Sequence, residues 1–326
     1  MKLGIVGIGM IVQEVLTFID ELDFDAVYIC GRKESESKVL QLVDEYKLTK
    51  AFFDYGEFLK SDVDLVYIAL LNNMHYDYAL KALNAGKHIM VEKPITTSKK
   101  ELEELIKLAD EKKCFLFEAM SIYHMPAFKQ LKKDMSLVGD VRIVNFNYSQ
   151  LSSRYKRFVD GDIAPVFDPK HAGGALRDLN IYNISAMVGL FGSPQSVFYK
   201  PNMIKGIDVS GILLADYGNF IATCIGAKDC TAPGPSTIQG ESATICIYPN
   251  VNGLHEYDVV FNDENTDTKE VDLSDGSHRL FFEFNDIINI ISNKNFEEAA
   301  RLIKYSVDTM DVIEQAVASA GLSDLT

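Results

Sequence analysis

Lys93 is the side chain in this sequence whose position most strongly suggests chemistry. It lies in Glu92-Lys93-Pro94, directly after the apolar run His88-Ile89-Met90-Val91. Such a run predicts a buried strand, and open α/β sheets bind their ligands at the carboxyl ends of their strands. An ammonium group there can stabilise alkoxide character on a reacting oxygen and lower the pKa of a neighbouring phenol from about 10 toward neutrality. The alternative is a solvated lysine at a helix entry.

A carboxyl and a phenol follow in the segment that begins with Gly173-Gly174. Asp178 and Tyr182 stand four residues apart, which places them on one face of a predicted helix. Tyr182 can exchange a proton with a hydroxyl or carbonyl group, while Asp178 binds a substrate hydroxyl or orients Lys93. In the alternative, the tyrosine packs in the core and the aspartate makes a local hydrogen bond. Lys93, Asp178 and Tyr182 are the predicted catalytic residues.

The chain begins with a predicted strand that runs into Gly7-Ile8-Gly9-Met10-Ile11 and then into a helix. Backbone amides at such a helix start can bind a pyrophosphate. Val12 stands at the third glycine position, which leaves less room for packing the helix on the strand. A plain tight turn is the alternative for the glycines alone. Together with Lys93 and Tyr182, however, the turn predicts a nicotinamide-dependent oxidoreductase.

The tip of the second predicted strand distinguishes between the two nicotinamide cofactors. NAD-binding proteins typically place an acid there to bind the ribose hydroxyls. This chain instead reads Cys30-Gly31-Arg32-Lys33. Two cations without an acid favour the 2′-phosphate of NADP(H), with NAD less favoured. A solvated basic turn is the alternative.

Length and composition indicate a soluble globular protein. The 326 residues exceed the usual size of one core, and 47% hydrophobic with 24% charged residues is ordinary for such proteins. No uncharged apolar stretch is long enough to span a membrane, and the first residues do not form a signal peptide. The net charge of −15 disfavours nucleic-acid binding. Five cysteines without a Cys-x-x-Cys pair indicate buried free thiols in a cytoplasmic protein, and the histidines form no metal site.

The order of predicted elements indicates two domains, an α/β domain followed by an α+β domain. Residues 1–120 alternate strands and helices, as in a Rossmann dinucleotide-binding domain, and residues 121–326 form a substrate-binding and dimerisation domain with a large, mostly antiparallel open sheet. The predicted strands are 3–8, 26–30, 65–71, 88–91, 115–118, 141–150, 207–217, 220–227, 244–248 and 257–262. The predicted helices are 76–85, 99–112, 125–135, 279–292 and 296–318, with a loop at 232–235.

These segments, in this order, resemble the glucose-fructose oxidoreductase/inositol dehydrogenase family of NAD(P)-dependent dehydrogenases. Besides the glycine turn, the resemblance is carried by Leu71-Asn72-Asn73-Met74-His75, Ala85-Gly86-Lys87-His88, Glu92-Lys93-Pro94, Glu118-Ala119-Met120 and Gly173-Gly174. It implies that Lys93 is the active-site lysine and that Asn72, His75 and Glu92 lie around the nicotinamide ribose. The predicted cofactor site then consists of Gly7, Ile8, Gly9, Met10, Ile11, Arg32, Lys33, Leu70, Leu71, Asn72, His75, Glu92 and Lys93.

Tyr182 stands where many members of that family carry histidine. It resembles the branch of dihydrodiol dehydrogenases, NADP-linked xylose dehydrogenases and glucose-fructose oxidoreductase, which mostly uses NADP, in agreement with Arg32. Besides Val12, the sequence departs from the family pattern at other places: Leu71 stands where a proline is usual, Asn180 where a glycine is usual, and Tyr123 with His124 occupies a stretch that commonly contains arginine. The predicted substrate-binding residues are Lys93, Tyr123, Asp178, Asn180 and Tyr182.

The sequence therefore predicts a cytoplasmic NADP(H)-dependent oxidoreductase. It would interconvert a secondary alcohol or hemiacetal and its carbonyl on a sugar, polyol or cyclic diol, without a metal. The alternative is a cofactor-binding sensor or regulatory protein of the same fold, which would not need Lys93, Asp178 and Tyr182 together. Because the antiparallel sheet needs cover on both faces, and the family resemblance agrees, we expect a homodimer or dimer of dimers through the second domain.

Overall fold

The computed structural model describes residues 1–322, and the chain divides into two compact units. One unit holds Met1–Ala119 together with Leu280–Lys304, and the other holds Met120–Arg279 together with the chain from Tyr305 onward. Helix α9 and the start of helix α10 thus group with the N-terminal strands, although they follow the second sheet in the sequence. They span Arg279–Ser292 and Phe296–Ser319.

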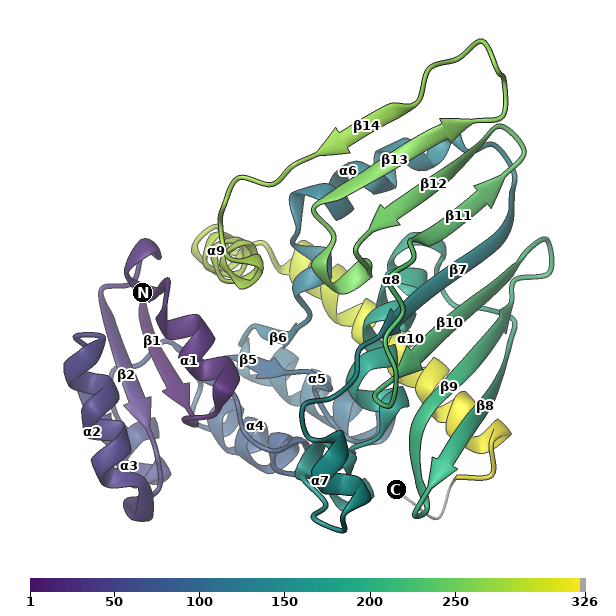
Figure 1. Cartoon of the computed structure of the whole chain (residues 1–326). Helices are drawn as coiled ribbons and strands as arrows, with labels where there is room; N and C mark the ends of the chain where they lie inside the picture. Colours follow the sequence, from purple (N-terminus) through teal and green to yellow (C-terminus); the bar gives the residue numbers. More distant parts are fainter. Residues whose placement is uncertain (323–326) are drawn as a thin grey trace. The chain divides into compact units, whose positions relative to one another are not determined.

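The first unit is built on a six-stranded parallel sheet in the order β3-β2-β1-β4-β5-β6 (Figure 1). The strand order reverses between β1 and β4, and open α/β sheets bind ligands at such a switch point. The predicted Rossmann fold is therefore confirmed. The strands are β1 Lys2–Val6, β2 Ala26–Cys30, β3 Lys50–Phe52, β4 Leu65–Ile68, β5 His88–Glu92 and β6 Leu116–Ala119.

Between the strands of this unit, the sequence predicts helices at 76–85 and 99–112, and misses Glu36–Glu45 and Tyr55–Leu59. Helix α5 has the predicted bounds, and the Ser98 hydroxyl caps it by accepting a hydrogen bond from the Glu101 amide at 3.3 Å. The strand predicted for 65–71 is wrong at its end, because β4 stops at Ile68. The Ala69 amide donates the last hydrogen bond to β1, to the carbonyl oxygen of Val6, where β1 itself ends. The helices are α1 Met10–Leu16, α2 Glu36–Glu45, α3 Tyr55–Leu59, α4 His75–Asn84 and α5 Lys99–Lys112.

The second unit contains an eight-stranded sheet in the order β14-β13-β12-β11-β7-β10-β9-β8 (Figure 1). Every neighbouring pair is antiparallel except β7 with β10, so the predicted mostly antiparallel sheet is confirmed. The strands are β7 Val141–Ser149, β8 Ser196–Ile204, β9 Ile207–Asp216, β10 Ile221–Ala227, β11 Ser236–Gly240, β12 Ala243–Tyr248, β13 Glu256–Phe261 and β14 Lys269–Asp272. The helices within it are α6 Pro126–Asp134, α7 Tyr155–Val159 and α8 Ile181–Phe191.

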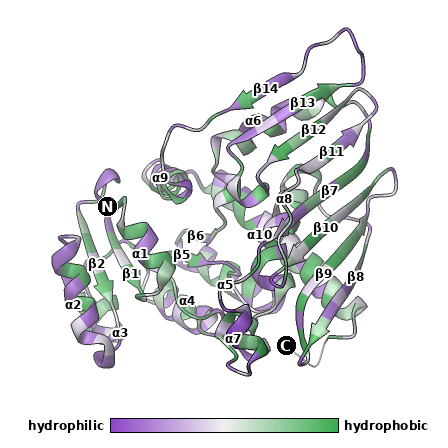
Figure 2. Cartoon of the chain, in the orientation of Figure 1, coloured by the Kyte–Doolittle hydropathy of each residue, from purple (hydrophilic) through white to green (hydrophobic). Residues whose placement is uncertain are grey.

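The two faces of the eight-stranded sheet differ in burial. On one face, a row of paired residues is fully buried: Ala215, Ala222, Val144, Ile238, Ile245 and Val259. On the other face, Phe198, Ile212, Leu214, Ile221 and Ile143 are exposed. Figure 2 shows hydrophobic colouring along β9 and β10. We call these five residues the open face; the apolar surface there is unusual for a strand face in contact with water.

The five cysteines differ in their exposure to solvent. Cys30, Cys114 and Cys224 are buried free thiols as expected, and Cys246 is half-buried. Cys230 is exposed, so the expectation of burial is wrong there because the residue lies beyond the end of β10. Within residues 1–322, no helix is both long and apolar enough to cross a membrane.

Candidate active site

The glycine turn after β1 has two glycines that serve different purposes. Gly7 has φ +120°, and a Cβ there would lie 2.2 Å from the Ala69 carbonyl oxygen, so the chain itself requires glycine. Gly9 has φ −71° and a Cβ there would meet nothing within 4 Å. Its missing side chain therefore leaves open space beside the start of α1. Such a space next to backbone amides fits the pyrophosphate of a dinucleotide.

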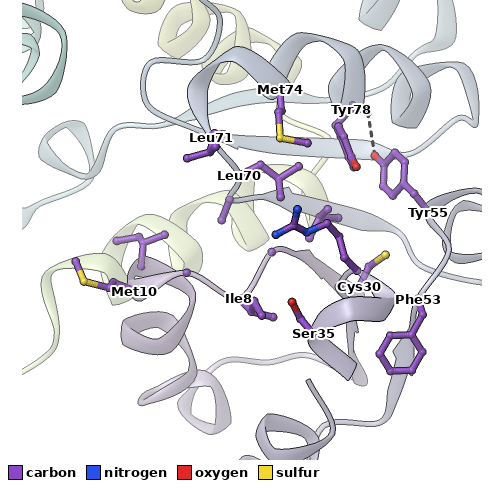
Figure 3. A pocket seen from close by; sticks show the side chains of 17 residues that line it. Ile8, Met10, Cys30, Ser35, Phe53, Tyr55, Leu70, Leu71, Met74 and Tyr78 are labelled. Atoms are coloured by element: carbon purple, nitrogen blue, oxygen red, sulfur yellow. Dashed lines mark hydrogen bonds between the residues drawn. The ribbon is translucent and has the colours of Figure 1, made fainter. Parts of the chain in front are cut away.

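A cavity of about 560 Å³ opens beside this turn (Figure 3). It lies where β1, β2 and β4 end, at the switch point of the sheet. The predicted cofactor residues that line it are Gly7, Ile8, Gly9, Met10, Ile11, Arg32, Leu70 and Leu71. Lining residues that the sequence analysis missed are Val6, Cys30, Gly31, Ser35, Phe53, Tyr55, Ala69, Met74 and Tyr78.

The missed residues form an apolar, partly aromatic wall. The Tyr55 hydroxyl donates to the Tyr78 carbonyl oxygen at 2.9 Å, and their ring centroids are 4.5 Å apart (Figure 3). Burial raises the pKa of the Cys30 thiol to about 12, so this thiol is neutral at physiological pH. A flat wall of this kind suits a heteroaromatic base. Phe53 and Tyr55 follow a strand of only three residues, and a short strand leaves little periodicity to detect.

Only one of the two predicted cations lines the cavity. Arg32 lines it and forms no ion pair within residues 1–322. The Lys33 ammonium lies 2.8 Å from the Glu36 carboxylate and 5.2 Å from the ring centroid of Phe53, outside the cavity lining. No acidic side chain is among the residues that line the cavity, and the Ser35 hydroxyl is. This combination fits a phosphate better than unmodified ribose hydroxyls.

The turn that carries Lys93 is held by two buried side chains. His75 is fully buried, with Nδ1 2.9 Å from the Pro94 carbonyl oxygen and Nε2 3.2 Å from that of Leu70. The Ile95 amide donates to a Glu118 carboxylate oxygen at 3.0 Å. Burial lowers the pKa of His75, while the contacts with the Pro94 and Leu70 carbonyls act in the opposite direction and raise it. His75 thus joins the ends of β4 and β5 and fixes the turn.

Several predicted cofactor residues lie outside the cavity lining. They are Lys33, Asn72, His75, Glu92 and Lys93. The Glu92 carboxylate accepts a hydrogen bond from the buried Tyr67 hydroxyl at 2.5 Å, and Asn72 begins a short 3-10 helix before α4. His75 and Glu92 therefore have structural contacts that the sequence does not reveal. Lys93 is half-buried at the carboxyl end of β5.

In the second unit, the Gly173-Gly174 segment leads into an irregular helix. Leu176–Asn180 is a π-helical stretch that continues into α8 at Ile181. Asp178 therefore lies in a π-helical turn, whereas Tyr182 lies in an α-helix. Gly174 has φ +109°, and a Cβ there would lie 1.9 Å from an Asp208 oxygen. That carboxylate also accepts a hydrogen bond from the Leu176 amide at 2.8 Å. π-helical turns are frequent at functional sites.

Asp178 has a partner that the sequence analysis did not identify. Its carboxylate lies 2.5 Å from the ammonium of Lys228, whose side chain is 2% exposed, whereas that of Asp178 is 27% exposed. Burial raises the pKa of nearby Asp208 to about 6, against hydrogen bonds from the Leu176 amide and the Tyr199 hydroxyl. Asp178 is therefore paired with Lys228, a lysine of the same unit.

Tyr182 is nearly buried, and two predicted substrate-binding residues are buried in the interior. The Tyr182 ring packs edge-on against Tyr148, with centroids 5.8 Å apart. Asn180 is fully buried; its amide donates to the Cys224 carbonyl oxygen at 3.0 Å and its oxygen accepts from Asn183 at 2.8 Å. The Tyr123 hydroxyl donates to the Ser185 carbonyl oxygen at 3.0 Å, and the residue is 6% exposed. Asn180 and Tyr123 therefore have structural roles in this unit.

The comparisons with known proteins agree with this arrangement. Residues 1–120 match the oxidoreductase family with an NAD-binding Rossmann fold. The scyllo-inositol 2-dehydrogenase (NADP(+)) IolU of Bacillus subtilis (strain 168) is 30% identical over 328 residues, which cover 98% of this chain and 97% of the relative. This chain belongs to that oxidoreductase family. The predicted family membership and enzyme class are confirmed.

One further relative and one solved structure extend the comparison for this oxidoreductase. The D-xylose 1-dehydrogenase (NADP(+)) 2 of Haloferax volcanii is 30% identical over 222 residues, covering 66% of this chain and 65% of the relative. The crystal structure of a 3-ketoreductase from Actinomadura kijaniata in complex with NADP and TDP-benzene has a TM-score of 0.82 at 17% identity, covering 98% of this chain and 97% of the other. At that identity the likeness shows a shared fold.

Proposed function

We propose that this oxidoreductase uses NADP(H) to interconvert a secondary alcohol or hemiacetal and its carbonyl on a sugar, polyol or cyclic diol. The observation that carries the cofactor assignment is Arg32 in a cavity without an acidic side chain. The named relatives support it, because both are NADP(+) dehydrogenases of polyhydroxylated substrates, an inositol and a xylose.

The residues of the cavity suit the parts of such a cofactor. The amides from Gly7 to Ile11 would hold the pyrophosphate, since Gly9 leaves space beside them. Arg32 and Ser35 would hold the 2′-phosphate. The wall of Phe53, Tyr55, Met74 and Tyr78 would hold the adenine. When bound, the nicotinamide supplies the hydride acceptor or donor of the reaction.

The catalytic roles proposed for the chain's own residues follow from their chemistry. In the oxidative direction, the substrate carbon loses a hydride and its hydroxyl loses a proton. Tyr182, as the phenolate, takes that proton at its oxygen and becomes the phenol, which returns the proton in the reverse direction. Lys93 supplies positive charge that stabilises the developing alkoxide. Asp178 accepts a hydrogen bond from a substrate hydroxyl.

The experiment that tests this function is a turnover assay on the purified chain. We expect NADP(H) to be oxidised or reduced with at least one member of a panel of aldoses, inositols and cyclic diols, and more slowly with NAD(H). Tight NADPH binding without turnover on any of them would instead favour the sensor that the sequence left as the alternative.

Arg32 should set the cofactor preference. We expect NADP(H) to bind roughly tenfold or more tightly than NAD(H), because a charge-assisted contact to phosphate contributes about 1.5–3 kcal/mol. Arg32→Ala should remove most of the difference. Fluorescence titration with both cofactors measures it. Lys33→Ala is the matched control, because Lys33 is paired with Glu36 and does not line the cavity. Equal dissociation constants for the wild-type chain would refute the assignment.

We also propose that the chain forms a cytoplasmic homodimer or dimer of dimers through the open face. Helix α8 packs on the buried face of the eight-stranded sheet, where the Cys224 Sγ lies 3.8 Å from the Met187 Sδ. The exposed residues of the open face are contiguous, since Phe198, Leu214 and Thr223 pair across three strands. A second copy would bury this apolar surface with self-complementary symmetry.

The oligomeric state should respond to a charge placed on the open face. Ile212 is 49% exposed, and Ile212→Glu would put an unpaired charge into the proposed contact, so we expect it to convert the assembly to monomers. Light scattering at micromolar concentration gives the mass. Leu40→Glu is the control, since Leu40 is similarly exposed, at 48%, on helix α2. A monomeric mass for the wild-type chain would refute the dimer.

A further inference from the structure

Lys228 lies directly after β10, in a rigid part of the second unit. Its amide donates to the Val209 carbonyl oxygen at 2.8 Å, and its carbonyl oxygen accepts from the Ser152 amide at 2.9 Å. Both backbone bonds continue the pairing of the sheet. The side chain therefore starts from a fixed point.

The ammonium of Lys228 lies against a carboxylate, a carbonyl oxygen and an aromatic ring. It lies 2.5 Å from the Asp178 carboxylate, donates to the Val166 carbonyl oxygen at 2.7 Å, and sits 4.6 Å from the ring centroid of Phe167. A buried ammonium is unfavourable unless it is paired and hydrogen-bonded, and these contacts meet that need. As a whole residue Lys228 is 1% exposed, so solvent does not reach the ion pair from the side of the lysine.

The same contacts organise the segment that carries the predicted catalytic residues. The Val166 carbonyl oxygen also accepts a hydrogen bond from the Gly174 amide at 3.1 Å, and the Asp178 amide donates to the Gly174 carbonyl oxygen at 3.1 Å. Through these hydrogen bonds, Lys228 connects Val166, Gly174 and Asp178. Removing its charge would take this cation away from the Asp178 carboxylate.

We propose that Lys228 is a positioning residue that keeps the Asp178 carboxylate ionised and in place, and that it acts on the reaction only through Asp178. This rests on the proposed function, in which Asp178 contacts the substrate. The ion pair between Lys228 and an oxygen of the Asp178 carboxylate restricts rotation of that carboxylate, and so holds it in one orientation toward a substrate hydroxyl. Other titratable groups around this segment are Asp208, Tyr199, Arg177, Tyr182 and Tyr148.

The test begins with Lys228→Met. We expect turnover to fall roughly 10–100-fold, since misplacing a substrate-contacting group by about 1 Å has effects of that size. The acidic limb of the pH–rate profile should move to higher pH, because a carboxylate that loses its cation is protonated more readily. NADP(H) affinity should stay unchanged. Lys133→Met, at an exposed position on α6, is the control and should match the wild type.

A second variant covers the case in which Lys228→Met does not fold. Lys228→Met combined with Asp178→Asn leaves no unpaired buried charge. Measured in single turnover, the double variant should react as fast as Asp178→Asn alone, because Lys228 acts only through Asp178. A double variant at least tenfold slower than Asp178→Asn would overturn the proposal. So would a folded Lys228→Met with wild-type turnover and pH dependence.

These outcomes are separable from those that test the function. Absence of turnover by the wild-type chain would refute the proposed function directly. If Tyr182→Phe stayed active while Lys228→Met shifted the acidic limb, the role of Tyr182 would fail and that of Lys228 would stand.

Discussion

Lys93→Met is expected to nearly abolish turnover while NADP(H) still binds. Methionine keeps much of the lysine stem but removes the charge that would stabilise the alkoxide. A cation also favours the ionised form of a nearby phenol, so its loss should shift the pH optimum of any residual activity upward as Tyr182 loses that influence. The measurement is a pH–rate profile of wild type and variant on the best substrate found.

The contacts around Lys93 make this variant interpretable. The turn is held by the contact of His75 with the Pro94 carbonyl oxygen and by the hydrogen bond from the Ile95 amide to Glu118, so the fold should survive. Lys100→Met, at an exposed position in α5, is the matched control. An unchanged rate with unchanged pH dependence would remove Lys93 from the chemistry and favour a cofactor-binding protein.

Tyr182→Phe is expected to lower turnover by about 10²–10⁴-fold, the scale of general acid–base catalysis. The change removes only the hydroxyl, so the ring contact with Tyr148 and the fold should remain. Cofactor affinity should be nearly intact, because the cavity is lined by residues of the first unit. Steady-state rates and NADPH titration together check both expectations.

Tyr148→Phe is the matched control for that variant. The Tyr148 hydroxyl donates to Gln150 at 3.1 Å and accepts from Asn252 at 3.2 Å, so it has structural partners of its own. We expect it to keep most of the activity. Near-normal turnover of Tyr182→Phe would instead show that Tyr182 packs in the core, and would give the proton role to Asp178 or Lys93.

Some elements could be predicted from the sequence and others could not. Helix α5 has the predicted bounds because fourteen residues of periodicity follow a serine cap. Strand β3 and helix α3 were missed, since three and five residues are too few for a period to emerge. The end of β4 was placed too late, because apolar Leu70 and Leu71 read as strand although they line the cavity.

The candidate site was predictable where it depends on local sequence. The glycine turn and Arg32 follow predicted strands directly, and both line the cavity. Lys228 could not be found in this way, because its pairing with Asp178 joins residues 50 positions apart through the sheet. The burial of Asn180 was also hidden. A sequence does not show whether the hydrogen bond of a polar side chain is accepted by solvent or, as here, by the carbonyl oxygen of Cys224.

The imidazole of His75 links the cofactor cavity to the turn that carries Lys93. One ring nitrogen faces the carbonyl of Leu70, which lines the cavity, and the other faces the carbonyl of Pro94, next to Lys93. Because the ring is buried and rigid, neither carbonyl can move by much without loss of a contact. We therefore expect that a displacement of the Leu70 carbonyl, in the cavity wall, would disturb the Pro94 carbonyl next to Lys93 through the His75 ring.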